Sequence, residues 1–527
     1  MIKKVYNQIK YFFCYSYHYI IIGGGTAGCP LAATLSSNYN VLLIERGGSP
    51  YGNPNITNLS SFGYSLSDHS ATSPSQRFIS EDGVINSRAR VLGGGTSLNA
   101  GFYSRAELKY VKDSSWDGKL VNESYEWVEK IVVFKPKVEA WQSAVRDGLL
   151  EAGVLPNNGF TFDHSNGTKI DGTIFDRSGH RHTAADLLQY ANPKRFTVLL
   201  HATVSRILFR SKGKQKPVAY GVIFTDASGI KHRAYLNQES GLGSKNEIIL
   251  SAGALGSPQL LMLSGVGPAD HLRSLNITVV VDQPLVGQGM SDNPMNAVYV
   301  PSPIEVEISR VQVVGITEFG SYIEALSGVN YLERALQIGN VAKVLEKLLP
   351  HAVIHSSTAF KGGFIFEKII GPLSTGVLEL TTKNPNANPV VTFNYFKEPE
   401  DLQRCAHGVK TIEKVIASKA FSKFRYDNIS FQALLYLTSS FPLNLVPKTG
   451  NDPTSLEQFC KNTVMTIWHY HGGCQVGKVI DQDYKVLGVD SLRVIDGSTF
   501  INSPRTNPQA TTMMLGRYMG IKILNES

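Results

Sequence analysis

Residues 19–46 read YIIIGGGTAGCPLAATLSSNYNVLLIER, and this stretch decides the fold of the chain. The apolar, β-branched run 19–22 predicts a buried strand, which the glycine-rich turn 23–28 ends. The segment CPLAATLSS that follows predicts a helix, and a second apolar run, 41–44, predicts another strand that ends in Glu45. The stretch therefore predicts the order strand, tight turn, helix, strand.

The glycines of this turn have separate physical roles. Gly23 permits the sharp turn, Gly25 lets a pyrophosphate approach the amides at the helix N-terminus, and Gly28 lets helix and strand pack closely. An acid at the end of the second strand, about 20 residues after the first glycine, is expected to bind a ribose hydroxyl, and Glu45 stands there. We therefore interpret the turn as a dinucleotide site and not as a merely structural glycine turn.

The composition is that of an ordinary globular protein. The 527 residues are 42% hydrophobic and 18% charged, which excludes a disordered chain and a coiled coil. The net charge of +8 is spread without any run of five like charges, so no nucleic-acid partner is expected. No uncharged apolar stretch reaches 18 residues, so no transmembrane segment is expected.

The N-terminal stretch MIKKVYNQIKYFFCYSYHYIII superficially resembles a signal peptide, with lysines before an aromatic-rich run. It continues directly into the strand at 19–22, so cleavage after it would remove part of the fold, and no cleavable signal peptide is expected. Five cysteines include no CxxC pair that would indicate zinc or redox chemistry. Seven N-x-Ser/Thr sequons would permit glycosylation of a secreted chain, although a chain of this length produces several by chance; they lie at Asn55, Asn58, Asn122, Asn166, Asn276, Asn428 and Asn525.

Two more glycine clusters follow along the chain. The loop 89–103, ARVLGGGTSLNAGFY, does not repeat the first motif, but its backbone could lie against a flat ligand or a phosphate. The stretch 253–267 follows the strand predicted at 247–250 and encloses a short apolar helix. Taken singly, the first of these clusters could also be a plain surface loop, and the second indicates only strand, turn, helix and turn.

Taken together, the turn 23–28 with Glu45, the loop 89–103 and the stretch 253–267 resemble the glucose-methanol-choline (GMC) oxidoreductase family, whose members bind FAD. The similarity extends from about residue 18 to the C-terminus. The stretches WHYHGG and DGSTF look most like the plant branch that contains the HOTHEAD and mandelonitrile lyase proteins.

This resemblance implies an α/β fold, α+β overall, with a doubly wound, Rossmann-like FAD-binding domain and an inserted substrate domain built on an antiparallel sheet. The FAD-binding domain is expected to be discontinuous, with residues 18–110, 197–300 and 455–527. The substrate-binding domain is then expected at 111–196 and 301–454.

The C-terminal part carries the predicted catalytic residues. In Trp468-His469-Tyr470-His471, alternation would place both histidines on one face of an extended segment, but nothing nearby supplies a clear third ligand, so no metal site is expected. The register of His469 matches the active-site histidine of the family, and imidazole can accept a proton from a hydroxyl at neutral pH. For His471 a histidine satisfied by hydrogen bonds in the core is favoured. Asn507 matches the second member of the family's His/His or His/Asn pair, although it could also cap the last helix.

The family pattern implies two groups of FAD contacts. The ADP half is expected to meet Gly23, Gly25, Thr26, Ala27, Gly28, Glu45, Arg46 and Val204. The isoalloxazine half is expected to meet Val91, Gly95, Thr96, Asn99, Ala100, Gly101, Phe102, Trp468, His469, Gly497, Pro508 and Gln509.

The resemblance implies oxidation of the CH–OH group of an alcohol, with His469 as the base and with dioxygen or another acceptor reoxidising FAD. Relatives like HOTHEAD are implicated in oxidising long-chain ω-hydroxy fatty acids, which makes such a molecule a candidate substrate. The alternative is a mandelonitrile lyase, which keeps FAD without net redox chemistry. The lyases place Tyr before the Trp-His pair and His at the second position, where this chain has Ile467 and Asn507, so oxidation is favoured. An inactive flavin-binding paralogue is a third possibility.

Three further expectations come from the family pattern. Plant relatives are secreted, so an extracellular location is expected. For a secreted chain, Cys405 and Cys460 are the favoured disulfide. Arg505 stands where relatives tend to have a small residue, and the sequence offers no account of it.

Overall fold

The computed structural model describes residues 16–211, 215–237, 246–328, 344, 347–348, 362–448 and 455–526. At its centre lies a parallel five-stranded sheet in the order β10-β3-β2-β14-β25. The first two strands in the chain, β2 (Tyr19–Ile22) and β3 (Val41–Ile44), are buried at every position, as expected for strands covered on both faces. The others are β10 (Phe196–Leu199), β14 (Glu247–Leu250) and β25 (Leu492–Val494).

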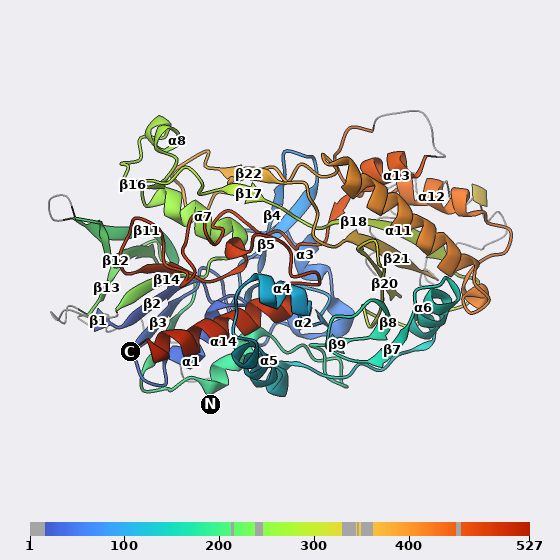
Figure 1. Ribbon diagram of the computed structural model, residues 1–527, viewed down its shortest axis with the longest axis horizontal. Helices are drawn as coiled ribbons and strands as arrows, with labels where there is room; N and C mark the ends of the chain where they lie inside the picture. Colours follow the sequence, from blue (N-terminus) through green and yellow to red (C-terminus); the bar gives the residue numbers. More distant parts are fainter. Residues whose placement is uncertain are drawn as a thin grey trace.

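Different layers cover the two faces of this sheet (Figure 1). Helices α1 (Gly28–Leu35) and α14 (Gln509–Asn525) pack against each other on one side. On the other side lie α7 (Gly253–Leu263) and a four-stranded sheet in the order β1-β13-β12-β11. The bounds of its strands are Ser16–Tyr17 (β1), Thr203–Arg210 (β11), Val218–Thr225 (β12) and Lys231–Leu236 (β13).

A second, seven-stranded sheet has the order β24-β18-β21-β20-β19-β8-β7 and is antiparallel except for the β7–β8 pair. One face packs on α11 (Pro399–Ala417) and α6 (Ala140–Glu151). The strands are β7 (Asn157–Phe160), β8 (Gly167–Ile170), β18 (Pro294–Pro301), β19 (Val313–Ile316), β20 (Ser321–Ser327), β21 (Gly362–Ile369) and β24 (Met465–Thr466).

The remaining elements are short or connect the two sheets. The helices are α2 (Pro54–Thr57), α3 (Tyr64–Ser67), α4 (Leu108–Asp113), α5 (Gly118–Val132), α8 (Ala269–Ser274), α12 (Phe431–Ser439) and α13 (Leu456–Thr463). The strands are β4 (Ser75–Ile79), β5 (Ile85–Ala89), β6 (Phe102–Tyr103), β9 (Gly172–Thr173), β15 (Val266–Gly267), β16 (Val281–Asp282), β17 (Gln288–Met290), β22 (Gly376–Glu379) and β23 (Val390–Val391).

Two segments lie on the other side of the domain boundaries that the sequence suggested. Strand β18, assigned to the FAD-binding domain up to residue 300, hydrogen-bonds to β21 and β24 and so belongs to the seven-stranded sheet. Helix α5, assigned to the substrate domain, packs instead against α14 and shares the core of the five-stranded sheet through Val121, Tyr125 and Val128. Its apolar stripe faces α14, which the sequence division did not anticipate.

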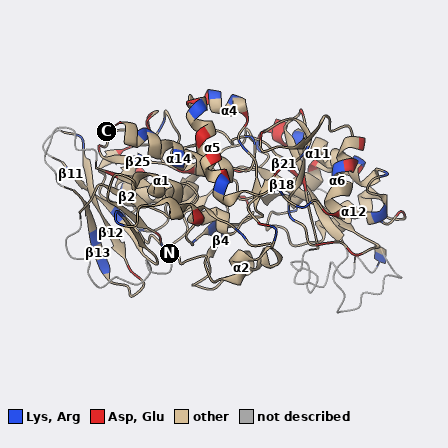
Figure 2. Cartoon of the chain, turned by 90° about the horizontal axis from the view of Figure 1, so that it is seen from below, with Lys and Arg blue, Asp and Glu red and all other residues tan. Residues whose placement is uncertain are grey.

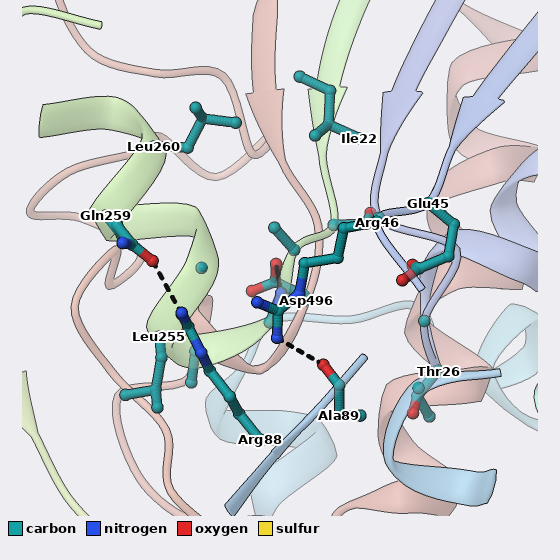
Figure 3. Close-up of a pocket in the computed structure, with 18 of the residues that line it drawn as sticks. Ile22, Thr26, Glu45, Arg46, Arg88, Ala89, Leu255, Gln259, Leu260 and Asp496 are labelled. Carbon is teal, nitrogen blue, oxygen red and sulfur yellow. Dashed lines mark hydrogen bonds between the residues drawn. The ribbon is translucent and has the colours of Figure 1, made fainter. Parts of the chain in front are cut away.

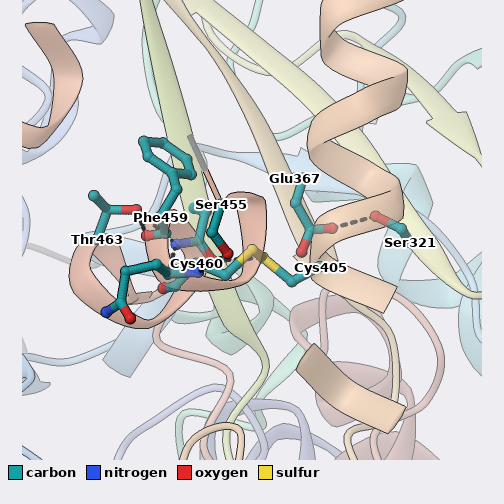
Figure 4. The surroundings of a disulfide bond; sticks show 9 residues. Ser321, Glu367, Cys405, Ser455, Phe459, Cys460 and Thr463 are labelled. Atoms are coloured by element: carbon teal, nitrogen blue, oxygen red, sulfur yellow. Dashed lines mark hydrogen bonds between the residues drawn. A yellow bond between two sulfur atoms is a disulfide. The ribbon is translucent and has the colours of Figure 1, made fainter. Parts of the chain in front are cut away.

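A disulfide joins Cys405 on α11 to Cys460 on α13, as the sequence analysis predicted (Figure 4). Lys and Arg are interspersed with Asp and Glu along the helices, for example on α5 (Figure 2). Within the described ranges, no helix is long and apolar enough to cross a bilayer.

Candidate active site

Two glycine loops meet at the end of β2. Gly23 has a φ of +103°, and a Cβ there would lie 2.3 Å from the carbonyl oxygen of Ser251. Gly94, in the second loop, has a φ of +59°, and a Cβ there would lie 2.8 Å from the Cα of Gly25. At both positions backbone packs directly against backbone, so only glycine fits there.

Glu45 holds the first loop in place. Its carboxylate accepts hydrogen bonds from the backbone N–H groups of Gly24 (2.9 Å) and Gly47 (2.7 Å). An ionised carboxylate has about four lone-pair sites, so it can still accept a further hydroxyl.

The loops open into a cavity between the five-stranded sheet and α7 (Figure 3). Eleven of the residues predicted to contact a cofactor line it, from the glycine turn, the ends of two strands, the second loop and the C-terminal part. They are Gly23, Gly25, Thr26, Ala27, Glu45, Arg46, Val91, Gly95, Val204, Trp468 and Gly497.

The other predicted contacts lie outside this cavity, although several join one another. Asn99 donates from Nδ2 to Oε1 of Gln509 (2.8 Å), and Nε2 of Gln509 donates to the carbonyl oxygen of Phe102. The second glycine loop is thereby bound to the first turn of α14. The predicted contacts outside the cavity lining are Gly28, Thr96, Asn99, Ala100, Gly101, Phe102, His469, Pro508 and Gln509.

Arg88 is a cavity residue that the sequence analysis did not identify. Only 6% of it is exposed, and its guanidinium donates to Oε1 of Gln259 (2.8 Å), Oε1 of Gln76 (3.2 Å) and the carbonyl oxygen of Ala387 (3.0 Å). All three acceptors are neutral, and burial lowers the pKa of Arg88 well below its usual value. A buried cation without a carboxylate partner favours a negatively charged ligand. In the sequence, the position of Arg88 just before the second glycine loop is the signal that could have identified it as a cavity residue.

His469 is anchored through its backbone by a buried carboxylate. Its N–H donates to Oδ1 of Asp292 (2.9 Å), whose Oδ2 accepts from the hydroxyls of Tyr395 (2.5 Å) and Thr466 (2.7 Å). Burial raises the pKa of Asp292 to about 6. The segment is not extended as predicted, because Trp468 has a φ of +59°, and this turn aims the next residue back into the protein.

The imidazole of His469 is almost fully buried, with 7% of the residue exposed. Its Nδ1 lies 3.1 Å from Nδ2 of Asn293. Burial, together with the charge of Lys368, holds the pKa of His469 well below its usual value, so the ring is neutral at pH 7. His471 is the satisfied core histidine that was predicted, because its Nδ1 bonds to the carbonyl oxygen of His469 (3.0 Å).

Asn507 is not the cap of the last helix. Pro508 is the N-cap residue of α14, and the carbonyl Oδ1 of Asn507 accepts a hydrogen bond from Nζ of Lys368 on β21. Two residues earlier, Arg505 adopts a φ of +63° and pairs with Glu107 across 3.1 Å. This ion pair gives Arg505 a structural partner that the sequence did not reveal.

Comparison with protein families identifies the chain. A model described as GMC oxidoreductase matches residues 17–295, and a second model of the same description matches residues 372–516. The chain belongs to the GMC oxidoreductase family. Several plant proteins match over nearly its whole length.

Three plant relatives illustrate the range within this GMC branch. Protein HOTHEAD from Arabidopsis thaliana is 53% identical over 97% of this chain and 88% of its own length. The sinapyl alcohol oxidase Nec3 from Nesocodon mauritianus is 45% identical over 97% of this chain and 89% of its own length. The (R)-mandelonitrile lyase 1 from Prunus serotina is 42% identical over 97% and 87%, respectively.

Solved GMC structures share the fold at low sequence identity. A formate oxidase superposes with a TM-score of 0.76 at 18% identity, covering 97% of this chain and 98% of its own. Pyridoxine 4-oxidase from Mesorbium loti also gives 0.76, at 19% identity, covering 96% of this chain and 98% of its own. These likenesses extend the mixed α/β architecture of the GMC family to this protein.

FAD is the cofactor of this GMC oxidoreductase. The cavity fits FAD on two observations of its own. Gly253 and Gly497 line the cavity with bare backbone, because a Cβ at either position would meet nothing within 4 Å, and Arg88 offers a buried positive charge without a carboxylate partner among the described residues. The diphosphate of FAD would supply a negative charge, and the cavity-lining residues named above would hold the cofactor.

Proposed function

We propose that the enzyme oxidises the CH–OH group of an apolar primary alcohol, with long-chain ω-hydroxy fatty acids as its substrate class. The observation that carries this proposal is the neutral, buried imidazole of His469 on a loop anchored by Asp292. FAD supplies the hydride acceptor in this chemistry. The protein's own residues then have to position the hydroxyl and take one proton.

His469 is the proposed base. A neutral imidazole can accept the hydroxyl proton at Nε2, and the positive charge of Lys368 disfavours any proton bound beforehand. Asn507 cannot take a proton, so it is proposed to orient the substrate oxygen by a hydrogen bond.

A buried apolar cluster close to the site in the chain supports the substrate class. Strands β18 and β21 place Tyr299 opposite Phe364 and Ala297 opposite Phe366 on the same face of the sheet. These four residues, with Met295, Leu437 and Phe441, form one hydrophobic cluster, against which Ile467 packs. Ile467 is two residues from His469, and we propose that an alkyl or aromatic group of the substrate packs near this cluster.

Cyanohydrin cleavage is less well supported. Ile467 and Asn507 occupy the positions where the lyases of this branch carry a tyrosine and a second histidine, and neither can move a proton. The cation next to Asn507 is the ammonium group of Lys368, which donates a hydrogen bond to the carbonyl oxygen Oδ1 of Asn507.

The test is anaerobic. The purified flavoprotein is mixed with 16-hydroxyhexadecanoic acid, benzyl alcohol or choline, and bleaching of the flavin band is recorded, while mandelonitrile is tested for release of cyanide. We expect bleaching with the hydroxy fatty acid and no cyanide. Cyanide release without bleaching would establish the lyase instead, and bound flavin that no alcohol bleaches would establish an inactive paralogue.

A variant tests the base. His469→Ala is expected to retain FAD, and its rate of flavin reduction is expected to fall by about 100-fold or more. The control His407→Ala, at an exposed position of α11, should bleach at the wild-type rate. Native-rate reduction by His469→Ala would exclude this mechanism.

We also propose that the protein works in an oxidising, extracellular compartment. The buried bond between Cys405 and Cys460 supports this, because structural disulfides persist mainly in such environments. Protein purified from its native tissue should gain the mass of two hydrogens on reduction at these cysteines, and an unchanged mass would contradict the proposal.

A further inference from the structure

The ammonium group of Lys368 joins three parts of the active site. Lys368 lies on β21 with 1% of its side chain exposed, and Nζ donates to Oε1 of Glu324 on β20 (2.5 Å) and to Oδ1 of Asn507. It also lies over the ring of Tyr322, 4.3 Å from the centroid. Glu324 balances its charge, so the ammonium is held as one half of a buried ion pair.

The chemistry of lysine settles which way the Asn507 amide points. An ammonium has three donors and no acceptor, so the atom of Asn507 that faces it is the carbonyl oxygen and not the NH2 group. The NH2 group therefore faces away from Lys368. Among the residues that the structure describes, no acceptor lies within hydrogen-bond distance of it, and the residue is part-exposed. The site thus presents an open donor.

The neighbouring residues restrict this amide further. The hydroxyl of Tyr322 donates to Oγ1 of Thr506 (3.1 Å), the residue before Asn507. On the other side of the same loop, Oγ of Ser503 lies 3.3 Å from Nδ2 of Asn293, which in turn contacts His469. The loop that carries Asn507 is therefore bound both to β20 and to the residue that contacts the proposed base.

We propose that Lys368 is a positioning residue that locks Asn507 as a hydrogen-bond donor to the substrate oxygen. A donor stabilises the negative charge that develops on this oxygen as the hydroxyl proton leaves. The proposal deepens the function given above and rests on it, since it names the residue that sets the role of Asn507. The positive charge of Lys368 acts from behind the amide and need not touch the substrate.

Asn507 variants test the direction of the hydrogen bond. Asn507→Ala removes the donor, whereas Asn507→Asp keeps the acceptor for Lys368 but replaces the NH2 group with a carboxylate oxygen. We expect flavin reduction to slow about tenfold in Asn507→Ala, which is the usual cost of one lost hydrogen bond, and at least as much in Asn507→Asp. Wild-type rates in Asn507→Asp would overturn the proposal.

A binding measurement keeps this test independent of turnover. Acetophenone and octanal carry only an acceptor oxygen, and their dissociation constants are obtained from the shift of the flavin spectrum. Both Asn507 variants should weaken binding about tenfold or more. Equal affinity in Asn507→Asp and wild type, or no binding to the wild type, would overturn the donor assignment. If the wild type binds these ligands but no alcohol bleaches the flavin, only the proposed function fails.

Lys368→Met tests the positioning role. We expect the rate of flavin reduction and the ligand affinity to fall three- to tenfold. Adding Asn507→Ala to Lys368→Met should reduce both quantities little further, because the two residues act as a unit. The matched control is Lys169→Met, which breaks the other buried ion pair, with Asp171, on the same sheet. Lys169→Met should lower the Tm by about as much as Lys368→Met does, while its ligand affinity stays within twofold of the wild-type value. Full additivity of Lys368→Met and Asn507→Ala, or an equal affinity loss in Lys169→Met, would refute the role.

Discussion

The amide of Asn293 lies 3.1 Å from Nδ1 of His469 and determines which imidazole nitrogen can act as the base. If Nε2 is to accept the substrate proton, Nδ1 must carry the hydrogen, and the atom of Asn293 that faces it must be Oδ1. In the present orientation Nδ2 faces His469, and Oδ1 is buried without a partner among the described residues. Rotating the amide by a half-turn lets Oδ1 accept from both Nδ1 and the hydroxyl of Ser503.

Asn293→Asp is expected to move the acid limb of the rate profile to higher pH. The rate falls when His469 becomes protonated, and the pKa of His469 is held well below its usual value by burial and by Lys368. A carboxylate beside Nδ1 favours the imidazolium form and raises this pKa. Stopped-flow flavin reduction from pH 4.5 to 9 measures the shift. Asn296→Asp, at a buried position of β18 whose amide bonds to Cys460 and Thr463, should leave the limb in place. Equal profiles for wild type and Asn293→Asp would contradict the prediction.

Arg88→Met is expected to weaken FAD binding at least tenfold and to raise the Tm of the apoprotein. The reason is that a buried guanidinium with neutral partners destabilises the apoprotein, whereas a bound diphosphate compensates its charge. Titration of deflavinated protein with FAD gives the affinity, and differential scanning fluorimetry gives the Tm. Arg77→Met, an exposed position on the neighbouring strand β4, should change neither. Undiminished FAD affinity in Arg88→Met would show that the cation has another role.

Gly94→Ala is expected to cost the protein its bound FAD. Its Cβ would lie 2.8 Å from the Cα of Gly25 and would separate the two glycine loops. Gly52→Ala is the matched control, because Gly52 also has a positive φ, +78°, yet a Cβ there meets nothing within 4 Å. Both variants carry the backbone strain, so the ratio of flavin to protein absorbance isolates the clash. Equal flavin content in the two variants would contradict this reading of the loops.

Local patterns predicted the parts of the fold that are local in sequence. The strand, turn, helix and strand of residues 19–46 form as expected, because an apolar run and a glycine turn specify their own geometry. The strand before Asp496 was also found, and it too depends on residue type at a recognisable spacing. The pair of Cys405 with Cys460 was predicted correctly as well, but as an expectation for a secreted member of the family and not from a local pattern.

The polar pairs that complete the site depend on sheet register, which the sequence does not display. Lys368 lies opposite Tyr322 and Met295 only because β21 pairs with β20 and β18 in one particular register. Asn507 before Pro508 has the pattern of a helix cap, and only its contact with Lys368 shows another role. Arg88 is one of 51 basic residues, and apart from its position just before the second glycine loop only its burial distinguishes it.

Glu367→Gln is expected to flatten the dependence of the Tm on pH. Glu367 is fully buried beneath α11, its Oε2 accepts from the hydroxyl of Ser321 (Figure 4), and burial raises its pKa to about 8. The unfolded chain releases this proton near pH 4.5, whereas the folded protein keeps it up to about pH 8, so stability from this group decreases as pH rises through that window. The difference between the Tm of Glu367→Gln and the Tm of the wild type should therefore increase by about 2 °C or more from pH 5 to pH 8. Glu318→Gln, an exposed position, should follow the wild type at every pH, and parallel curves for Glu367→Gln would mean that Glu367 is ionised in the folded protein.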